Sequence, residues 1–217
     1  MKYILGNWKA NKNFTEMKQW IYTFQREYRP HENVTVGIFP PLPFVSYVQG
    51  KLKDCRNVFV GSQTISSFEK GSYTGEVTAT SLEGVASYSI IGHSERRKTF
   101  SETDVQLQEK VKQALAYGIV PVYCVRDEKD PIPAGVRFVA YEPVAAIGTG
   151  QNEPPEQTLA MKKKMKLPKD VIFLYGGSVD EKNASDYFAT NEIDGFLIGT
   201  ACLDPMQFIA VIQAAQT

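Results

Sequence analysis

The chain has 217 residues and carries equal numbers of basic and acidic side chains, 24 Lys and Arg against 24 Asp and Glu. The resulting formal net charge of zero argues against the basic surface of a nucleic-acid binder. No apolar run reaches the roughly 18 residues of a membrane span, and residues 1–12 lack the long apolar region of a secretory signal. We therefore expect one domain over 1–217, with neither nucleic acid nor membrane as partner.

The cysteines are few and separated. Cys55, Cys124 and Cys202 are odd in number and form no CxxC pair. We interpret them as thiols in a reducing cytoplasm, and we expect no metal site.

Short apolar runs rich in β-branched residues predict eight strands. Each run is apolar almost throughout, as expected for parallel strands that are covered on both faces. The runs lie at 2–6, 34–39, 57–61, 88–92, 119–125, 136–141, 171–175 and 194–199.

Segments with helical periodicity fill most of the gaps between these strands. The first places apolar residues from Met17 to Phe24 three and four apart, and the second ends at Gly118, a plausible C-cap. The last opens with Asp204 as N-cap and Pro205 as its first helical residue. The predicted helices are 15–28, 103–118, 154–166, 180–189 and 204–215.

Eight strands that alternate with helices favour an α/β fold, a single (β/α)8 barrel, over the alternative of an open doubly wound sheet. The connection between the fifth and sixth strands is unusual, because only ten residues separate them, Arg126 to Gly135. A parallel crossover usually takes a dozen or more. We expect the helix there to be shortened or missing. One flank of the barrel should then be uncovered unless a partner subunit covers it.

Polar residues and glycines follow the predicted strand ends, where barrels of this kind build their active face. Taken singly, Lys9 could be a solvated lysine, His93 a hydrogen-bonded structural residue and Glu142 a salt-bridged rim residue. On one barrel rim they would instead place a base, an imidazole and an ammonium around one small volume. The full set is Asn7, Lys9, His93, Ser94, Glu95, Glu142, Gly176, Gly177, Ser178, Gly199 and Thr200.

Two glycine turns suggest an anion site. "YGGSVD" (175–180) and "IGTA" (198–201) follow the seventh and eighth strands, where backbone N–H groups can point at a phosphate. Tight turns that need positive φ are the alternative. "GTGQNE" (148–153) is not a dinucleotide fingerprint, because Glu153 replaces the third glycine.

Five segments resemble, in order, the signature segments of the triosephosphate isomerase family. They are "GNWKAN" (6–11), "IGHSERR" (91–97), "AYEPVAAIGTG" (140–150), "YGGSV" (175–179) and "DGFLIGTA" (194–201). The resemblance implies a TIM barrel and an isomerase of glycolysis and gluconeogenesis in the cytoplasm. It interconverts dihydroxyacetone phosphate and glyceraldehyde 3-phosphate, and no cofactor or metal is implied.

The resemblance also implies a role for each matching residue. Glu142 would shuttle a proton through an enediolate, His93 would polarise the substrate oxygens as a neutral imidazole, and Lys9 would counter the developing charge. Asn7 would lie beside Lys9, and Glu95 would hold Lys9 in place. The phosphate would meet N–H groups of Gly148, Ser178, Gly199 and Thr200.

The lid implied by the resemblance follows the proposed base. It comprises Pro143, Val144, Ala145, Ala146, Ile147, Gly148 and Thr149. Ala145 stands where the family usually has tryptophan, and Thr200 stands where it usually has glycine. We expect a looser lid from the first change and no lost N–H donor from the second. We also expect the short fifth connection to cost stability more than chemistry.

The assembly implied by the resemblance is a homodimer. The loop that contains Thr74, "GSYTGE" (71–76), looks like the family's interface loop and would reach the partner's Asn7 and Lys9; a tetramer is not excluded. A phosphate-binding protein with little turnover and a phosphosugar enzyme of another barrel family remain the alternative functions.

Overall fold

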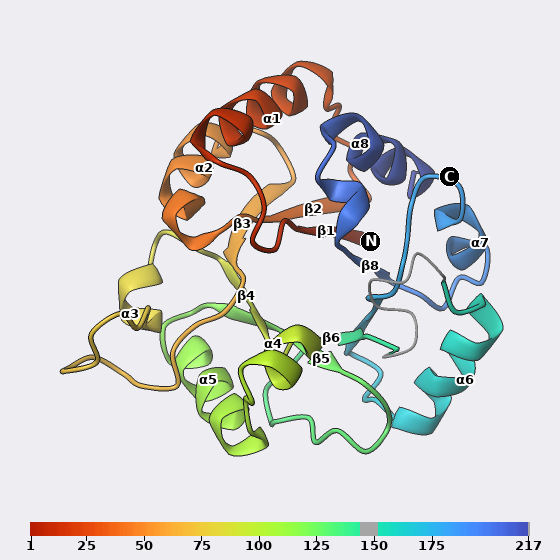
Figure 1. Ribbon diagram of the computed structural model, residues 1–217. Helices are drawn as coiled ribbons and strands as arrows, with labels where there is room; N and C mark the ends of the chain where they lie inside the picture. The colour runs from red at the N-terminus through yellow and green to blue at the C-terminus, as the bar shows by residue number, and fades with distance from the viewer. Residues whose placement is uncertain (144–151, 217) are drawn as a thin grey trace.

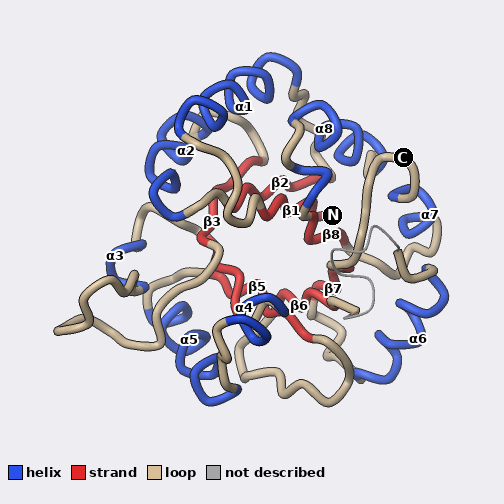
Figure 2. Tube along the Cα trace, in the orientation of Figure 1, coloured by secondary structure: helices blue, strands red, loops and turns tan. Residues whose placement is uncertain are grey.

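Eight parallel strands close into one barrel in the computed structural model, which describes residues 1–143 and 152–216. Consecutive strands pair in parallel, and β8 closes the ring by pairing with β1. Figure 1 views this ring with the helices around it, and Figure 2 shows the strands at the centre. The strands are β1 Lys2–Asn7, β2 Val34–Phe39, β3 Val58–Ser62, β4 Tyr88–Ile91, β5 Val120–Val125, β6 Phe138–Tyr141, β7 Ile172–Tyr175 and β8 Gly195–Ile198. All eight predicted strands are therefore confirmed, and the open sheet is ruled out.

Helices surround the barrel in the gaps between strands. All five predicted helices exist, although α7 is shorter than the predicted 180–189. Three others, α2, α3 and α4, were not predicted individually. The helices are α1 Phe14–Glu27, α2 Val45–Leu52, α3 Ala79–Leu82, α4 Ser94–Thr99, α5 Asp104–Ala116, α6 Pro155–Met165, α7 Ala184–Phe188 and α8 Pro205–Ala214, with short 3-10 helices η1 at Leu42–Phe44 and η2 at Thr200–Cys202.

The helix ends follow from local hydrogen bonds. Asn13 begins α1 in a capping box with Glu16, and this satisfies two backbone N–H groups that the helix itself cannot. Asp204 caps α8 as predicted, since its carboxylate accepts N–H bonds from the first turn. Gly118 follows the end of α5 with a positive φ of 67°, the conformation that favours glycine after a helix.

Two apolar layers hold the barrel together. Alternate strand residues such as Leu5, Phe39 and Leu174 fill the inside of the barrel. The other strand residues face outward and pack against the helices, where Trp20, Phe24 and their neighbours are buried. Because both faces of every strand are buried, the strands read as continuous apolar runs in the sequence.

The fifth connection contains no helix, as predicted, but the expectation of an uncovered flank is wrong. The outward-facing residues Tyr123 and Val139 are fully buried in the single chain. Ile132, inside the connection, packs against the outer apolar layer. The guanidinium and backbone N–H of Arg126 donate to Asp130, which holds the start of the connection in a compact turn. The flank is therefore buried within the single chain although the connection contains no helix.

Candidate active site

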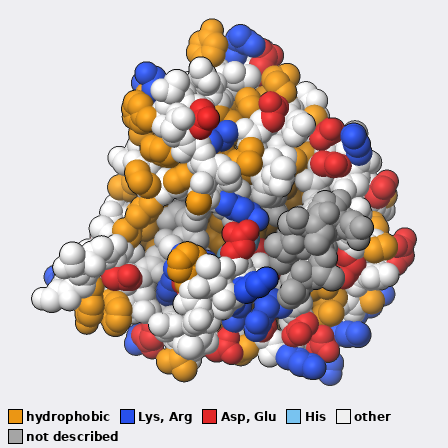
Figure 3. Space-filling model, viewed as in Figure 1, with side chains coloured by type: hydrophobic (Ala, Val, Ile, Leu, Met, Phe, Trp, Pro, Cys, Tyr) orange, Lys and Arg blue, Asp and Glu red, His pale blue; other side chains and the backbone are white. Residues whose placement is uncertain are grey.

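A pocket of about 340 Å³ opens at the carboxyl ends of the strands and brings most of the predicted site residues together. Charged side chains of both signs gather around the centre of this face (Figure 3). Asn7, Lys9, His93, Glu142, Ser178, Gly199 and Thr200 all line the pocket. Glu95 lies beside it through its contact with Lys9. Val144, Ala145, Ala146, Ile147, Gly148 and Thr149, assigned to the lid or the phosphate site, lie outside the described residues.

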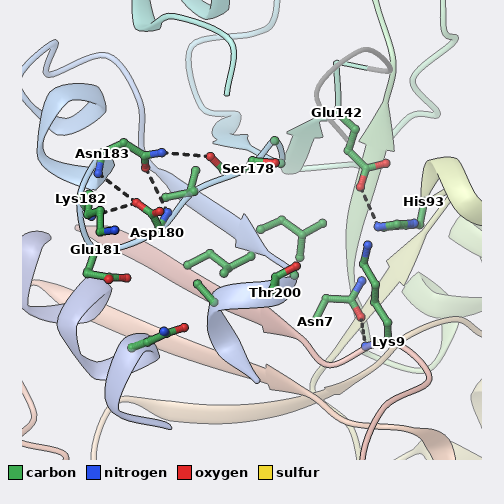
Figure 4. A pocket seen from close by; sticks show the side chains of 18 residues that line it. Asn7, Lys9, His93, Glu142, Ser178, Asp180, Glu181, Lys182, Asn183 and Thr200 are labelled. Carbon is green, nitrogen blue, oxygen red and sulfur yellow. Dashed lines mark hydrogen bonds and ion pairs between the residues drawn. The ribbon is translucent and has the colours of Figure 1, made fainter. Parts of the chain in front are cut away.

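Glu142 follows β6 directly, and its side chain is almost fully buried. Its Oε2 accepts the backbone N–H of Ser94 at 2.8 Å, and its Oε1 lies 2.9 Å from Nε2 of His93. Its own backbone N–H donates to Val125 of the neighbouring strand. A buried carboxylate is costly unless it is paired. These contacts therefore fix Glu142 opposite the imidazole, as the close view shows (Figure 4).

His93 stands at the N-cap of α4, immediately after β4. Its Nδ1 accepts the backbone N–H of Glu95 at 3.2 Å, so the ring proton belongs on Nε2, which faces Glu142. Burial lowers the pKa of His93, but the charge and hydrogen bond of Glu142 outweigh it and leave that pKa above its usual value. The Glu95 N–H already donates to Nδ1, so a second ring proton would have to displace that hydrogen bond. The ring is thus built to donate from Nε2.

Lys9 occupies a strained position at the rim. Its φ of 52° lies in the left-handed region, which is costly for a residue with a side chain. Two contacts hold this conformation: Asn7 Oδ1 accepts the Lys9 N–H at 3.0 Å, and Gln63 Nε2 donates to the Lys9 carbonyl at 2.9 Å. The ammonium then donates to Glu95 at 2.6 Å. A Cβ on Gly199 would lie 3.2 Å from Cε of Lys9, so glycine there leaves space for the lysine.

The turns after β7 and β8 form the other side of the pocket. Asp180 accepts the backbone N–H groups of Lys182 and Asn183, and Asn183 donates to the Ser178 carbonyl. This network shapes the segment from Ser178 to Asn183, although the predicted helix was to begin at Asp180. Thr200 opens the 3-10 helix η2. The two predicted glycine turns therefore face Glu142, His93 and Lys9 across one hollow.

Two residues were missed as part of the site. Gln63 follows β3, and its amide donates to the carbonyls of Lys9 and Phe39. Ser94 was recognised at a strand end but was given no role, although its N–H holds the Glu142 carboxylate. The rule that strand ends carry function would have found Gln63. No sequence signal shows which side chain supports a backbone carbonyl.

Among residues 1–143 and 152–216, no group of three or more His, Cys, Asp or Glu side chains is arranged to hold a metal ion. Over the same ranges, no helix combines the length and apolar character needed to cross a bilayer.

The chain is similar to known proteins along nearly all of its length. The family model for triosephosphate isomerase matches residues 2–215. Triosephosphate isomerase of Aquifex aeolicus is 34% identical over an alignment 243 positions long, gaps included, which covers 97% of this chain and 98% of the relative. The enzyme of Thermus thermophilus is 34% identical over 248, and that of Alcanivorax borkumensis is 38% identical over 249; each alignment covers 98% of both chains.

Proposed function

The chain belongs to the triosephosphate isomerase family, and from that premise we propose that Glu142, His93 and Lys9 interconvert dihydroxyacetone phosphate and D-glyceraldehyde 3-phosphate. This interconversion serves glycolysis and gluconeogenesis. The observation that carries the proposal is the contact of a buried carboxylate with an imidazole, 2.9 Å apart, in a pocket that an ammonium also lines. The cytoplasmic location stays a prediction.

Glu142 is the base of this mechanism. It removes a proton from the carbon beside the substrate carbonyl and returns it to the adjacent carbon, so that an enediolate lies between ketose and aldose. A carboxylate is a weak base in water, and a site that excludes water makes it more effective. The near-complete burial of the Glu142 side chain supports this role.

His93 and Lys9 stabilise the negative charge that develops on the substrate oxygens. Fixed donors in a site of low dielectric stabilise such charge most effectively, because they need no reorganisation during the reaction. The Nε2 proton of His93 is free to serve a substrate oxygen once the substrate replaces Glu142 as its acceptor. The ammonium of Lys9 supplies a full positive charge. Asn7, Gln63 and Glu95 keep it at the rim.

The substrate phosphate binds at the glycine turns after β7 and β8. Backbone N–H groups of Ser178, Gly199 and Thr200 are the proposed donors, together with Gly148. These turns line the same pocket as His93 and Glu142, which supports a pose in which one triose phosphate extends from the turns to the base. Pro143 and the following residues to Thr149 form the lid in this proposal.

A homodimer is the proposed assembly. The segment 63–78 extends away from the barrel (Figure 1), and Thr74 within it is exposed. A second hollow lies beside the active site, lined by Lys9, Gln63, Glu95 and Phe100. Thr74 of one subunit would enter this hollow on the other and approach the partner's Lys9. Sedimentation analysis of Thr74→Arg tests this arrangement: a monomer is expected, and an unchanged dimer would contradict it.

A coupled assay of triose phosphate interconversion on the purified protein tests the function. Turnover in both directions is expected, with a large loss in Glu142→Asp and in His93→Gln while the far-UV circular dichroism stays unchanged. Binding of 2-phosphoglycolate without any turnover would instead favour a phosphate-binding protein. Turnover of a different phosphosugar alone would favour another barrel enzyme.

A further inference from the structure

Glu153 receives contacts from three separate elements. The chain leaves the barrel after Glu142 and is described again from Asn152, next to Glu153. The hydroxyl of Tyr141 on β6 donates to Glu153 Oε2 at 3.1 Å, and the Glu153 N–H donates to the hydroxyl of Tyr175 on β7 at 2.8 Å. The hydroxyl of Tyr187 on α7 donates to the Glu153 carbonyl. Glu153 thus forms hydrogen bonds to three tyrosine hydroxyls through its carboxylate, its backbone N–H and its backbone carbonyl.

The surroundings make this contact set rigid. The three tyrosines are almost fully buried, and the rings of Tyr175 and Tyr187 stack with centroids 4.6 Å apart. The second carboxylate oxygen of Glu153 accepts the hydroxyl of buried Thr158 at 3.3 Å. Burial, with the charge of Glu153, raises the pKa of Tyr141, so its hydroxyl remains a donor at neutral pH. A hydrogen bond to a charged carboxylate is among the stronger kinds of hydrogen bond.

Both strand ends that Glu153 contacts continue directly into the active site. Tyr141 immediately precedes Glu142, and the Tyr141 carbonyl accepts the Gly176 N–H at 2.7 Å. Tyr175 immediately precedes the turn of Gly176 and Gly177, and a Cβ on Gly177 would lie only 2.2 Å from the Tyr175 hydroxyl. This turn therefore needs glycine because the tyrosine that binds the Glu153 N–H occupies the space.

We propose that Glu153 is a positioning residue: through the Tyr141 hydroxyl, its carboxylate fixes the end of β6 so that Glu142 faces His93. The proposal rests on the assignment of Glu142 as the base, and it adds a residue that touches neither substrate nor reacting atoms. Its carboxylate positions Glu142 through the hydrogen bond from Tyr141. Its backbone N–H holds Tyr175, which precedes the glycine turn after β7, and a side-chain substitution leaves this second contact in place.

Kinetics of five variants, four single and one double, separate a positioning role from an effect on general stability. Glu153→Ala and Tyr141→Phe are each expected to lower kcat about tenfold with little change in KM, and the double variant should be no slower than either single one. Glu153→Gln should recover most of kcat, because its amide oxygen still accepts the Tyr141 hydroxyl. Glu156→Ala, on the exposed first turn of α6, is the matched control and should match the wild type. If the fold losses in kcat of Glu153→Ala and Tyr141→Phe multiply in the double variant, the two residues act independently and the proposal is overturned.

Titration of His93 by NMR tests whether Glu153 positions Glu142. Because it needs no turnover, it separates this inference from the proposed isomerase activity. Glu142, Glu95 and Lys9 are the charged groups that act on the imidazole. If Glu153 positions Glu142, the Glu153→Ala and Tyr141→Phe variants lower the pKa of His93, whereas Glu156→Ala leaves it unchanged. Tyr141→Phe keeps the packing of the ring and remains informative if Glu153→Ala folds poorly. A His93 titration identical in the wild type and Tyr141→Phe would overturn the proposal.

Discussion

The proposed catalytic rim and the flank between β5 and β6 differ in the interactions that hold their side chains in place. At the rim, Glu142, His93 and Lys9 place ionisable groups in partly or fully buried positions, and each is held by a specific hydrogen bond. On the flank, Tyr123 and Val139 are fully buried although the connection between β5 and β6 contains no helix. Apolar side chains can be buried by a loop as well as by a helix, because the hydrophobic effect has no preferred direction. Charged side chains do not have this freedom, because the hydrogen bonds that hold them need a fixed geometry.

The comparison indicates that chemistry and stability reside in different layers of this barrel. Substitutions at the rim should reduce turnover while the protein stays folded. Substitutions on the flank should reduce the free energy of unfolding while the turnover of each folded molecule stays the same. Function often costs stability at such sites, so some rim variants are expected to melt at a slightly higher temperature than the wild type.

The largest effect is expected for Lys9→Met. Under the proposed mechanism, loss of the ammonium removes the fixed positive charge that stabilises the enediolate, and kcat should fall about 100- to 1000-fold. The melting temperature should change little, because the lost ion pair with Glu95 is partly exposed and the backbone contacts of residue 9 remain. Lys18→Met, an exposed lysine of α1, is the control. Turnover within threefold of the wild type in Lys9→Met would show that the ammonium has no part in the chemistry.

The next largest effect is expected for a substitution on the flank, and it concerns the free energy of unfolding. Ile132→Ala removes the apolar anchor of the fifth connection and should cost about 2 kcal/mol of unfolding free energy. For a chain of this size that corresponds to a fall in Tm of about 4–8 °C. Steady-state kinetics at 25 °C should be unchanged. Val105→Ala, exposed on α5, should leave both quantities as they are. Loss of kcat in Ile132→Ala would mean that the flank and the rim are coupled.

A smaller effect is expected for Asp130→Asn. Burial raises the pKa of Asp130, but the hydrogen bonds from Arg126 outweigh it and hold that pKa below its usual value. The charged carboxylate therefore stabilises the fold above about pH 4, and this contribution is lost as the pH falls through the lowered pKa. Asp130→Asn should lose about 1 kcal/mol at pH 7, and its Tm should converge with that of the wild type in acid. A gap in Tm that persists at low pH would contradict this.

The smallest effect is a shift in the titration of His93. Glu142→Gln removes the negative charge that raises the pKa of the imidazole, so that pKa should fall. In the wild type, protonated His93 stabilises the fold below about pH 6.5, and this contribution is lost as the pH rises through the raised pKa. NMR of the ring protons measures the shift, with His31 as the internal reference. An unchanged titration in Glu142→Gln would mean that the contact at 2.9 Å does not persist in solution.

The barrel was predictable from the sequence because each strand is buried on both faces. This burial produces a continuous apolar run that can be recognised in the sequence. The predicted strand boundaries agree with the observed ones within two residues at most ends. The helices α2 and α4 were missed for the opposite reason. They span eight and six residues, too short for helical periodicity to show clearly, and such short helices depend on tertiary packing.

The site was predictable only in part. Glu142 and His93 follow strands directly, so the geometry of a parallel barrel was enough to bring them to one rim. The support of Lys9 by Gln63 was not predictable, because it joins a side-chain amide to a backbone carbonyl 54 residues away. The covering of the flank by Ile132 was also missed. Prolines and glycine in that connection predicted the missing helix, but they say nothing of how a loop packs.

Isomerisation in deuterium oxide tests the proton shuttle most directly. If Glu142 removes a proton from C1 of dihydroxyacetone phosphate and the enediolate is protonated at C2, part of the glyceraldehyde 3-phosphate formed should carry deuterium at C2. Glu142→Gln should form almost no product, with or without the label. Rapid turnover with no deuterium at C2, together with comparable rates in Glu142→Gln, would contradict the mechanism.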